Sequence, residues 1–339
     1  MSQLPLQNSV KLRFLWKKAE PIVGNAYFAL VILLLLCIVF RPEFENPRTL
    51  CMIARQMSCV GIIALGMTFV IAGGGIDLSV GSMFAFSGVV TVISFQYITG
   101  HPGLLPESLY ATPAGAFVLA LLISSLTGAL SGALNGFLIV TCKLPPFIAT
   151  LGTLSIFRSL ALHLAHSGSL PLPQSVSFAE IADPQIAYIP LTSVFFLVLT
   201  FIFAILMKNT AFGHHVCAVG ANERVARYAG IRTGLVTFAT YVITGICVGV
   251  AMVLYLGQLE GVSNDAGNLY ELDAIAAVVI GGTPMNGGKA SVWGTLAGAL
   301  ILGLIFSFLN FVGTASTLRD LVKGAIILLS VFIQRKEKV

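Results

Sequence analysis

The chain has 339 residues, of which 57% are hydrophobic and only 10% are charged, and its formal net charge is +5. Soluble domains carry about 25% charged residues, so this composition excludes an ordinary soluble protein and indicates a polytopic membrane protein. The basic residues lie in short clusters beside apolar segments, which favours a membrane over nucleic acid as the reason for the positive charge. The six cysteines lie mostly in apolar segments without CxxC pairs, and they predict neither a disulfide framework nor a metal site.

The N-terminal segment 1–21 carries Lys and Arg ahead of the first apolar run, as a signal peptide would. That run continues to Phe40 and ends in Arg-Pro-Glu without a small-residue cleavage site, so we interpret it as a retained first helix.

Because a helix needs about 20 apolar residues to cross a bilayer, the hydropathy pattern predicts an all-α membrane bundle in one transmembrane domain, 1–339. The eighth span is too short to cross alone, and a count of ten requires the Gly-rich segment after it to complete the passage. The ten predicted spans are 22–40, 51–72, 81–99, 113–140, 146–165, 188–207, 234–256, 272–283, 291–309 and 319–334.

Lysine and arginine orient these spans, because cytoplasmic loops are enriched in both. With a cytoplasmic N-terminus and ten spans, the opposite face keeps only Arg41, Arg48 and Arg319. Both termini, including the segment 1–21, are then cytoplasmic. The loops on the opposite face instead carry the acids Glu180, Asp183, Glu260, Asp265, Glu271 and Asp273. The cytoplasmic basic residues are Lys11, Arg13, Lys17, Lys18, Lys143, Lys208, Arg224, Arg227, Arg232, Lys289, Arg335, Lys336 and Lys338.

A Gly-rich break separates the second and third spans at 73–82, with Asp77 and Ser79 inside it. Unpaired backbone groups are not tolerated in hydrocarbon, so a break at membrane depth must be buried in protein or line a wet cavity. A carboxylate at that depth is costly and marks a functional site. The alternative is a short surface loop in which Asp77 caps the next helix.

A second break, 281–289, lies between the eighth and ninth spans, also on the predicted cytoplasmic side. Interrupted segments in comparable places of two halves predict an internal repeat with a pathway between the halves. The small residues of 128–133 and 294–298 favour close helix packing.

The longest cytoplasmic loop, 208–233, predicts a short helix that Asn222 caps, that begins at Glu223 and that Gly230 ends. A capped helix between spans suits a docking element for a cytoplasmic partner. The alternative is a solvated connector whose basic residues reflect only the positive-inside rule.

Four motifs together resemble the membrane permeases of ribose-type sugar ABC importers. They are the break 74–82, the segment Pro145–Thr153, the loop Val219–Ile231, and the stretch from Tyr270 through Gly287-Gly288 to Thr295. The resemblance extends from about Leu30 to Gln334. In the loop, Ala221 and Arg224 replace the second and fifth residues of the family's usual Gly-Gly-Asn-Glu-Glu.

The resemblance implies a permease domain in a bacterial inner (plasma) membrane, paired with an identical or related permease subunit. A cytoplasmic ABC ATPase uses ATP and Mg²⁺, and a binding protein delivers sugar from outside. It also favours the docking interpretation of 208–233, with Gly220, Asn222, Glu223, Arg224, Ala226, Arg227 and Gly230 as ATPase-coupling residues.

No catalytic constellation appears, and Gly287-Gly288-Lys289-Ala290 lacks the phosphate-binding pattern GxxxxGK[ST]. The chain is therefore expected to bind no cofactor or metal and to leave ATP hydrolysis to another subunit. The residues expected to line the translocation path or form the helix breaks are Gly74, Gly75, Asp77, Ser79, Asn135, Arg158, Gly281, Gly282 and Thr283.

Two roles remain open for the polar residues inside the membrane. Asp77 and Arg158 form a buried ion pair that fixes a helix crossing, or hydroxyls and amides line a path for a neutral polyol. The alternative function is an ion-coupled secondary sugar transporter that uses Asp77. The sequence does not specify which sugar or polyol is carried.

Overall fold

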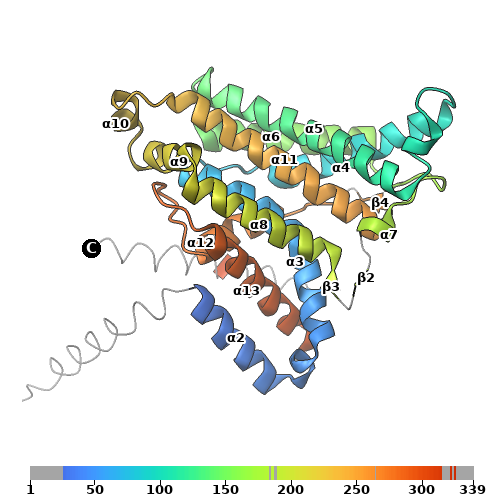
Figure 1. The fold of residues 1–339 in the computed structure, drawn as a ribbon, viewed down its shortest axis with the longest axis horizontal. Helices are drawn as coiled ribbons and strands as arrows, with labels where there is room; N and C mark the ends of the chain where they lie inside the picture. Colours follow the sequence, from blue (N-terminus) through green and yellow to red (C-terminus); the bar gives the residue numbers. More distant parts are fainter. Residues whose placement is uncertain are drawn as a thin grey trace, which may run out of the picture.

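The computed structural model describes residues 26–182, 185–186, 189–263, 265–314, 321–322 and 324–325. In these ranges the chain forms a bundle of long apolar helices (Figure 1), and the predicted polytopic helical architecture is confirmed. Within the described residues, seven helices are long and apolar enough to cross a membrane: α3 (Pro47–Ala72), α4 (Val80–Gly100), α5 (Pro113–Val140), α6 (Pro146–Leu164), α8 (Leu191–Asn209), α11 (Thr233–Leu259) and α13 (Val292–Phe311).

Shorter elements connect and flank these spans. The helical ones are α2 (Ala26–Phe40), η1 (Pro42–Glu45), η2 (Glu107–Leu109), α7 (Ala179–Ala182), α9 (Ala211–Ala221), α10 (Glu223–Tyr228) and α12 (Tyr270–Ile280). The strands form two antiparallel pairs. β1 (Leu170–Pro171) pairs with β4 (Gly261–Val262), and β2 (Gln185–Ile186) pairs with β3 (Ile189–Pro190).

Local sequence signals set several helix starts. Asn46 accepts a hydrogen bond from the Arg48 backbone N–H, and Pro47 begins α3. Thr112 caps α5 in the same manner, with Pro113 at the first helical position. Proline suits that position because the first helical N–H groups have no partner within the helix.

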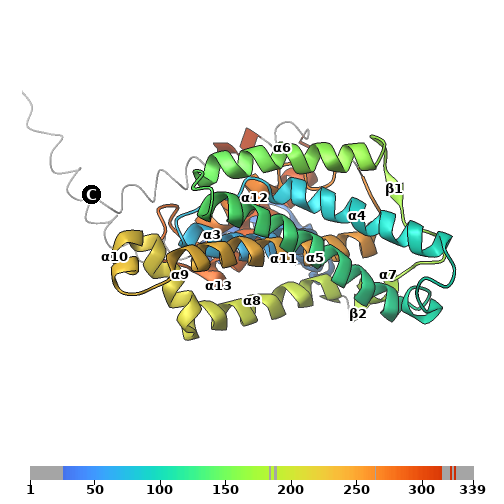
Figure 2. The ribbon, with the colours of Figure 1, turned by 90° about the horizontal axis from the view of Figure 1, so that it is seen from above.

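Helix α11 packs along α5 over much of its length (Figures 1 and 2). Glycines at the crossing bring the two backbones together: a methyl group added at Gly128 would overlap the Gly245 carbonyl, and one added at Gly132 would overlap the Tyr241 carbonyl. Gly249 is equally close to Ser124. The small residues of 128–133 therefore serve helix packing, as predicted.

The second small-residue motif works in the same way. A methyl group added at Gly294 would overlap the Gly281 carbonyl, and one added at Gly298 would overlap the Ala277 carbonyl. Helix α12 is thereby held against α13, and α13 also packs on α3 and α2.

One end of the bundle carries most of the described basic side chains. The end of α5 lies beside the start of α11, where Val140 is the neighbour of Gly234. At the same end, the backbone N–H of Gly288 donates to the Ala72 carbonyl, and Gly288 adjoins Ala221. Helices α9 and α10 lie there too, at the left of Figure 1. We call this the basic end; it holds Lys143, Lys208, Arg224, Arg227, Arg232 and Lys289.

The structure does not establish ten spans. The predicted first span, 22–40, contributes the 15-residue helix α2 to the described part. The predicted tenth span, 319–334, lies outside the described residues except at four positions. The internal repeat stays a prediction.

The expectation for the eighth span was wrong in one respect. Helix α12 has only 11 residues, and the Gly-rich segment after it is already at the basic end, where Gly288 bonds to Ala72. The segment before α12 completes the passage instead: β4 pairs with β1, and Gly267 then packs against Gly81 at the start of α4. The sequence gives the length of a half-helix, but it does not show whether the segment before the helix or the segment after it lies within the membrane.

Candidate coupling and translocation site

Three glycine-rich segments meet at the basic end, and we call their contact the glycine junction. It consists of Ala72–Gly75, which is the last residue of α3 and the three residues after it, together with Gly220–Ala221 at the end of α9 and Gly287–Gly288 in the second break. Gly288 N lies 2.9 Å from Ala72 O. A methyl group on Gly287 would lie 2.9 Å from the Gly74 nitrogen and 3.0 Å from the Gly220 carbonyl oxygen. The two predicted breaks are thus in direct contact with each other and with the loop that carries α10.

Glycine is needed at the junction for backbone shape as well as for space. Gly74, Gly287 and Gly288 have φ values of +84°, +76° and +83°, a region that other L-residues rarely adopt. Gly282 has φ +90°, but a methyl group there would meet nothing within 4 Å, so this glycine serves only the turn.

Thr283 and Gly281 anchor the second break to α13. Thr283 is fully buried, and its hydroxyl accepts a hydrogen bond from the Ser291 backbone N–H at 3.0 Å. Gly281 is pressed against Gly294. The second break is therefore fixed at both ends, by the Ala72 bond and by α13.

The part of the first break that carries Asp77 and Ser79 is buried in the bundle, whereas Gly74 is exposed, so Asp77 does not lie in a surface turn. Asp77 and Ser79 are both 0% exposed. The Asp77 carboxylate accepts hydrogen bonds from the Ser79 backbone N–H at 2.9 Å and from the Ser79 hydroxyl at 2.7 Å. Tyr241 of α11 donates its hydroxyl to the carbonyl of Ile76 at 3.2 Å. Polar groups exposed by the interrupted helix thus find partners inside the protein.

A chain of hydrogen bonds ties Asp77 to two other helices. The Asn135 amide, from α5, donates to the Ser79 hydroxyl at 2.8 Å and lies 3.4 Å from each Asp77 carboxylate oxygen. The Thr153 hydroxyl, from α6, donates to the side-chain amide oxygen (Oδ1) of Asn135 at 2.7 Å. All four side chains are at most 1% exposed. This network holds the first break against α5 and α6.

Arg158 lies in a different environment, and the possible ion pair with Asp77 is not formed. Its guanidinium donates to the Ala266 carbonyl at 2.9 Å and interacts electrostatically with the carboxylates of Glu271 and Asp265. The structure therefore brings Asp77, Ser79 and Asn135 together and places Arg158 in a second polar cluster.

Sequence reasoning missed the residues of that second cluster. Asp265 and Glu271 were assigned to a loop outside the membrane, yet Glu271 lies in the first turn of α12; Asp273, assigned to the same loop, is buried within α12. The short length of the predicted eighth span could have indicated that these residues lie within the membrane. A helix that crosses only half of the membrane requires an adjoining segment of chain to cross the other half.

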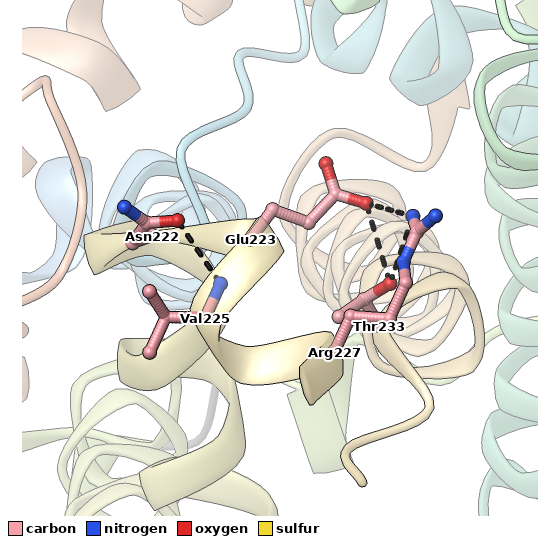
Figure 3. Close-up of polar contacts among 5 residues, drawn as sticks. All are labelled: Asn222, Glu223, Val225, Arg227 and Thr233. Atoms are coloured by element: carbon pink, nitrogen blue, oxygen red, sulfur yellow. Dashed lines mark hydrogen bonds and ion pairs between the residues drawn. The ribbon is translucent and has the colours of Figure 1, made fainter. Parts of the chain in front are cut away.

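Helix α10 has the predicted local structure (Figure 3). The Asn222 side chain accepts a hydrogen bond from the Val225 backbone N–H at 3.1 Å, and Gly230 follows the helix with φ +84°. Glu223 binds Arg227 at 2.6 Å and accepts a hydrogen bond from the Thr233 hydroxyl at 3.3 Å. These contacts fix α10 to the start of α11.

The outer face of α10 is apolar as well as charged. Val225 is 61% exposed and Tyr228 is 92% exposed, three positions apart and so on one side of the helix. Ala226 is buried beneath them. Neither Val225 nor Tyr228 was among the predicted coupling residues, although their spacing of three positions on the predicted short helix indicates a shared face.

We expect Asp77→Ala and Asn135→Ala each to lower the unfolding temperature of the purified chain, because each leaves a buried polar partner unsatisfied at a cost of about 1–3 kcal/mol. The double variant should lose less than the sum of the two, since both remove the same contact. Thermal unfolding in detergent measures this, with Ser155→Ala on the exposed face of α6 as the control. Additive losses would show that the two side chains act independently.

Comparison with known proteins gives consistent matches over most of the chain. Residues 49–331 match the family described as "Branched-chain amino acid transport system / permease component". The ribose import permease protein RbsC of Bacillus subtilis is 35% identical over 92% of each chain. The Escherichia coli K12 protein of the same name is 33% identical over 97% of this chain and 99% of its own. The galactofuranose transporter permease protein YtfT of Escherichia coli K12 is 32% identical over 98% of this chain and 94% of its own.

Proposed function

The chain belongs to the family of branched-chain amino acid transport system permease components, and we propose that it is the permease subunit of an ABC importer for a monosaccharide or related polyol. The family description mentions amino acids, but the three relatives above are named for ribose and galactofuranose and align over nearly the whole chain. A sugar cargo follows from those relatives.

The observation that carries this function is the direct contact of both helix breaks with the end of α9, the helix that immediately precedes α10. Helix α10 projects from the basic end with an exposed apolar face, and the loop that holds it touches the first and second breaks through the glycine junction. A cytoplasmic ATPase docked on α10 would thus act on the two places where the membrane helices are interrupted. ATP and Mg²⁺ are used by that ATPase, and this chain binds no cofactor of its own.

The remaining partners follow from the same assignment. A second permease subunit, identical or related, pairs with this chain in the membrane, and an external binding protein delivers the sugar. The basic end faces the cytoplasm by the positive-inside rule. In a bacterium this places the multi-pass chain in the inner (plasma) membrane with both termini cytoplasmic.

An ion-coupled mechanism through Asp77 has less support. The Asp77 carboxylate is 0% exposed and is bonded by Ser79 and Asn135 of the same chain. A proton- or sodium-coupled site needs access from each side of the membrane in turn, whereas these contacts support a structural role in the first break.

Reconstitution in proteoliposomes tests the function. The chain is inserted with and without its cognate ATPase and binding protein, and uptake of the sugar bound by that binding protein is measured. We expect uptake only with all components and ATP, and no effect of dissipating the ion gradient. Uptake by this chain alone, abolished by an ionophore, would instead establish a secondary transporter.

A further inference from the structure

A cavity of about 320 Å³ lies next to Arg158, apart from the Asp77 network and the glycine junction. Its apolar wall is Leu154 and Leu162, which flank Arg158 on one face of α6. Its polar wall comes from Ser82 of α4 and from the segment before and within the first turn of α12: Asp265, Asn268 and Glu271. Small-molecule sites are typically about 300–1,000 Å³, so the cavity suits a small solute.

The cavity lies near the middle of the membrane. Helix α6 begins at the basic end, and Arg158 is about 18 Å along it at the helical rise of ~1.5 Å per residue. Helix α12 ends at the basic end, and its first residue is about 15 Å away by the same rise. Both distances are close to half of the ~30 Å hydrocarbon core. Polar groups at that depth are costly and mark a solute pathway.

The wall is chemically mixed and is held in place. The Arg158 guanidinium donates to the Ala266 carbonyl at 2.9 Å, which fixes it to the turn that carries Asp265 and Asn268. That turn is itself packed against α4, because Gly267 touches Gly81 and Phe84. The Ser82 hydroxyl donates to the Ser79 carbonyl at 2.8 Å, so its oxygen is oriented as an acceptor. The cavity therefore presents preorganised donors and acceptors on three elements.

The balance of charge selects the class of solute. One guanidinium faces two carboxylates, Glu271 and Asp265, which interact with it electrostatically. An anion entering the cavity would meet a wall with a net negative charge, whereas a simple cation would meet Arg158 at its centre. A neutral polyhydroxy compound can donate to the carboxylates and accept from the guanidinium and from the Asn268 amide, without an ion to desolvate.

We infer that this cavity is a binding site for a neutral sugar or polyol within the membrane, with Arg158, Asp265, Asn268 and Glu271 as its hydrogen-bonding groups and with selection against phosphorylated sugars. The inference rests on the proposed function for its substrate class. It adds a specific site inside the permease, so that recognition is not left to the binding protein alone.

Binding to the full chain in nanodiscs, without partner proteins, tests the site directly. The probes are D-ribose, D-galactose and ribitol, each compared with its phosphate ester, and saturation-transfer difference NMR detects binding. We expect at least one neutral probe to bind and no ester to bind. Asn268→Ala should weaken the binding about tenfold, the loss typical of one hydrogen-bonding partner. Glu271→Gln should weaken the binding as well. If one of the two variants does not fold, the other still tests the site.

The matched control is Glu107→Gln, which neutralises an exposed acid in η2 outside the cavity and should leave binding unchanged. Absence of binding by every neutral probe, preferential binding of an ester, or unchanged binding in both cavity variants would overturn the inference. Uptake by the complete importer separates the two proposals. If Asn268→Ala leaves the KM for sugar unchanged while uptake still requires the ATPase, the cavity is not the binding site, and the permease role is still supported. If uptake needs no ATPase, the permease role falls, and the nanodisc result still decides the site.

Discussion

Val225→Asp should abolish ATP-driven sugar uptake by the reconstituted importer while the chain still inserts and folds. Val225 is 61% exposed on a helix at the basic end, beside Tyr228 at 92% exposed. In the free chain an aspartate there stays in water, so folding is unaffected. In the docked complex it would be an unpaired carboxylate in an apolar contact, and a loss of ~3 kcal/mol at such a position corresponds to about 100-fold in affinity for the ATPase.

Two measurements check this result: uptake in proteoliposomes, and co-purification of the ATPase with the permease in detergent. Val225→Ile is the matched control, because it keeps the shape and the apolar character and should retain uptake. Full uptake by Val225→Asp would show that α10 does not dock the ATPase through this face.

The Glu223–Arg227 pair needs a different design. The two side chains are exposed and bind each other at 2.6 Å across one helical turn, and such pairs contribute only about 0.3–0.5 kcal/mol to the helix. Arg227→Glu alone would place a second carboxylate one turn from Glu223. The repulsion could destabilise α10, so a loss of uptake could not be assigned to weaker ATPase docking. Exchanging both residues restores the pair within the chain but removes the Thr233–Glu223 contact, so a loss of uptake greater than that of Thr233→Val reports contact with the ATPase.

Gly220→Ala should reduce uptake by at least about tenfold with little change in the amount of protein in the membrane. The added methyl group would overlap the Ala72 carbonyl and lie 2.7 Å from the Gly288 nitrogen. It would therefore separate the two atoms whose 2.9 Å hydrogen bond joins the first and second breaks. Overpacking of this kind costs about 1–3 kcal/mol, and here the strain falls on the contact between the end of α9 and both breaks.

The measurement is the ratio of sugar transported to ATP hydrolysed. If the junction transmits movement, the variant should transport less sugar per ATP while the protein remains folded. Gly152→Ala is the matched control: this glycine lies within α6, and an added methyl group would meet nothing within 4 Å. Equal transport ratios for the two variants would contradict a role for the junction in coupling.

The position of Asp77 bears on both predictions. Its carboxylate is tied to α5 and α6 through Ser79, Asn135 and Thr153. The first break is thus fixed about Asp77 and meets the second break at Gly74. The start of α4 follows this fixed segment, and α4 contributes Ser82 to the cavity beside Arg158.

The sequence by itself determined those features that depend on neighbouring residues. Membrane spans follow from long apolar runs, the α10 cap follows from Asn222 and Gly230, and the glycines of 128–133 indicated a close helix crossing. These signals act over at most a few turns of helix, so a single chain segment carries them completely.

Only the tertiary structure decided which distant segments meet. Asp77 and Asn135 are 58 positions apart in the chain, and Arg158 contacts Ala266 across 108. The neighbouring residues do not indicate whether Arg158 or Asn135 is the partner of Asp77. They also do not indicate that the segment before α12 lies within the membrane while the segment after it lies at the basic end. The physical reason is that a buried polar group requires a hydrogen-bonding partner and a half-helix requires a second membrane segment, but neither requirement specifies which residues meet it. Which residues meet it depends on how all the helices pack together.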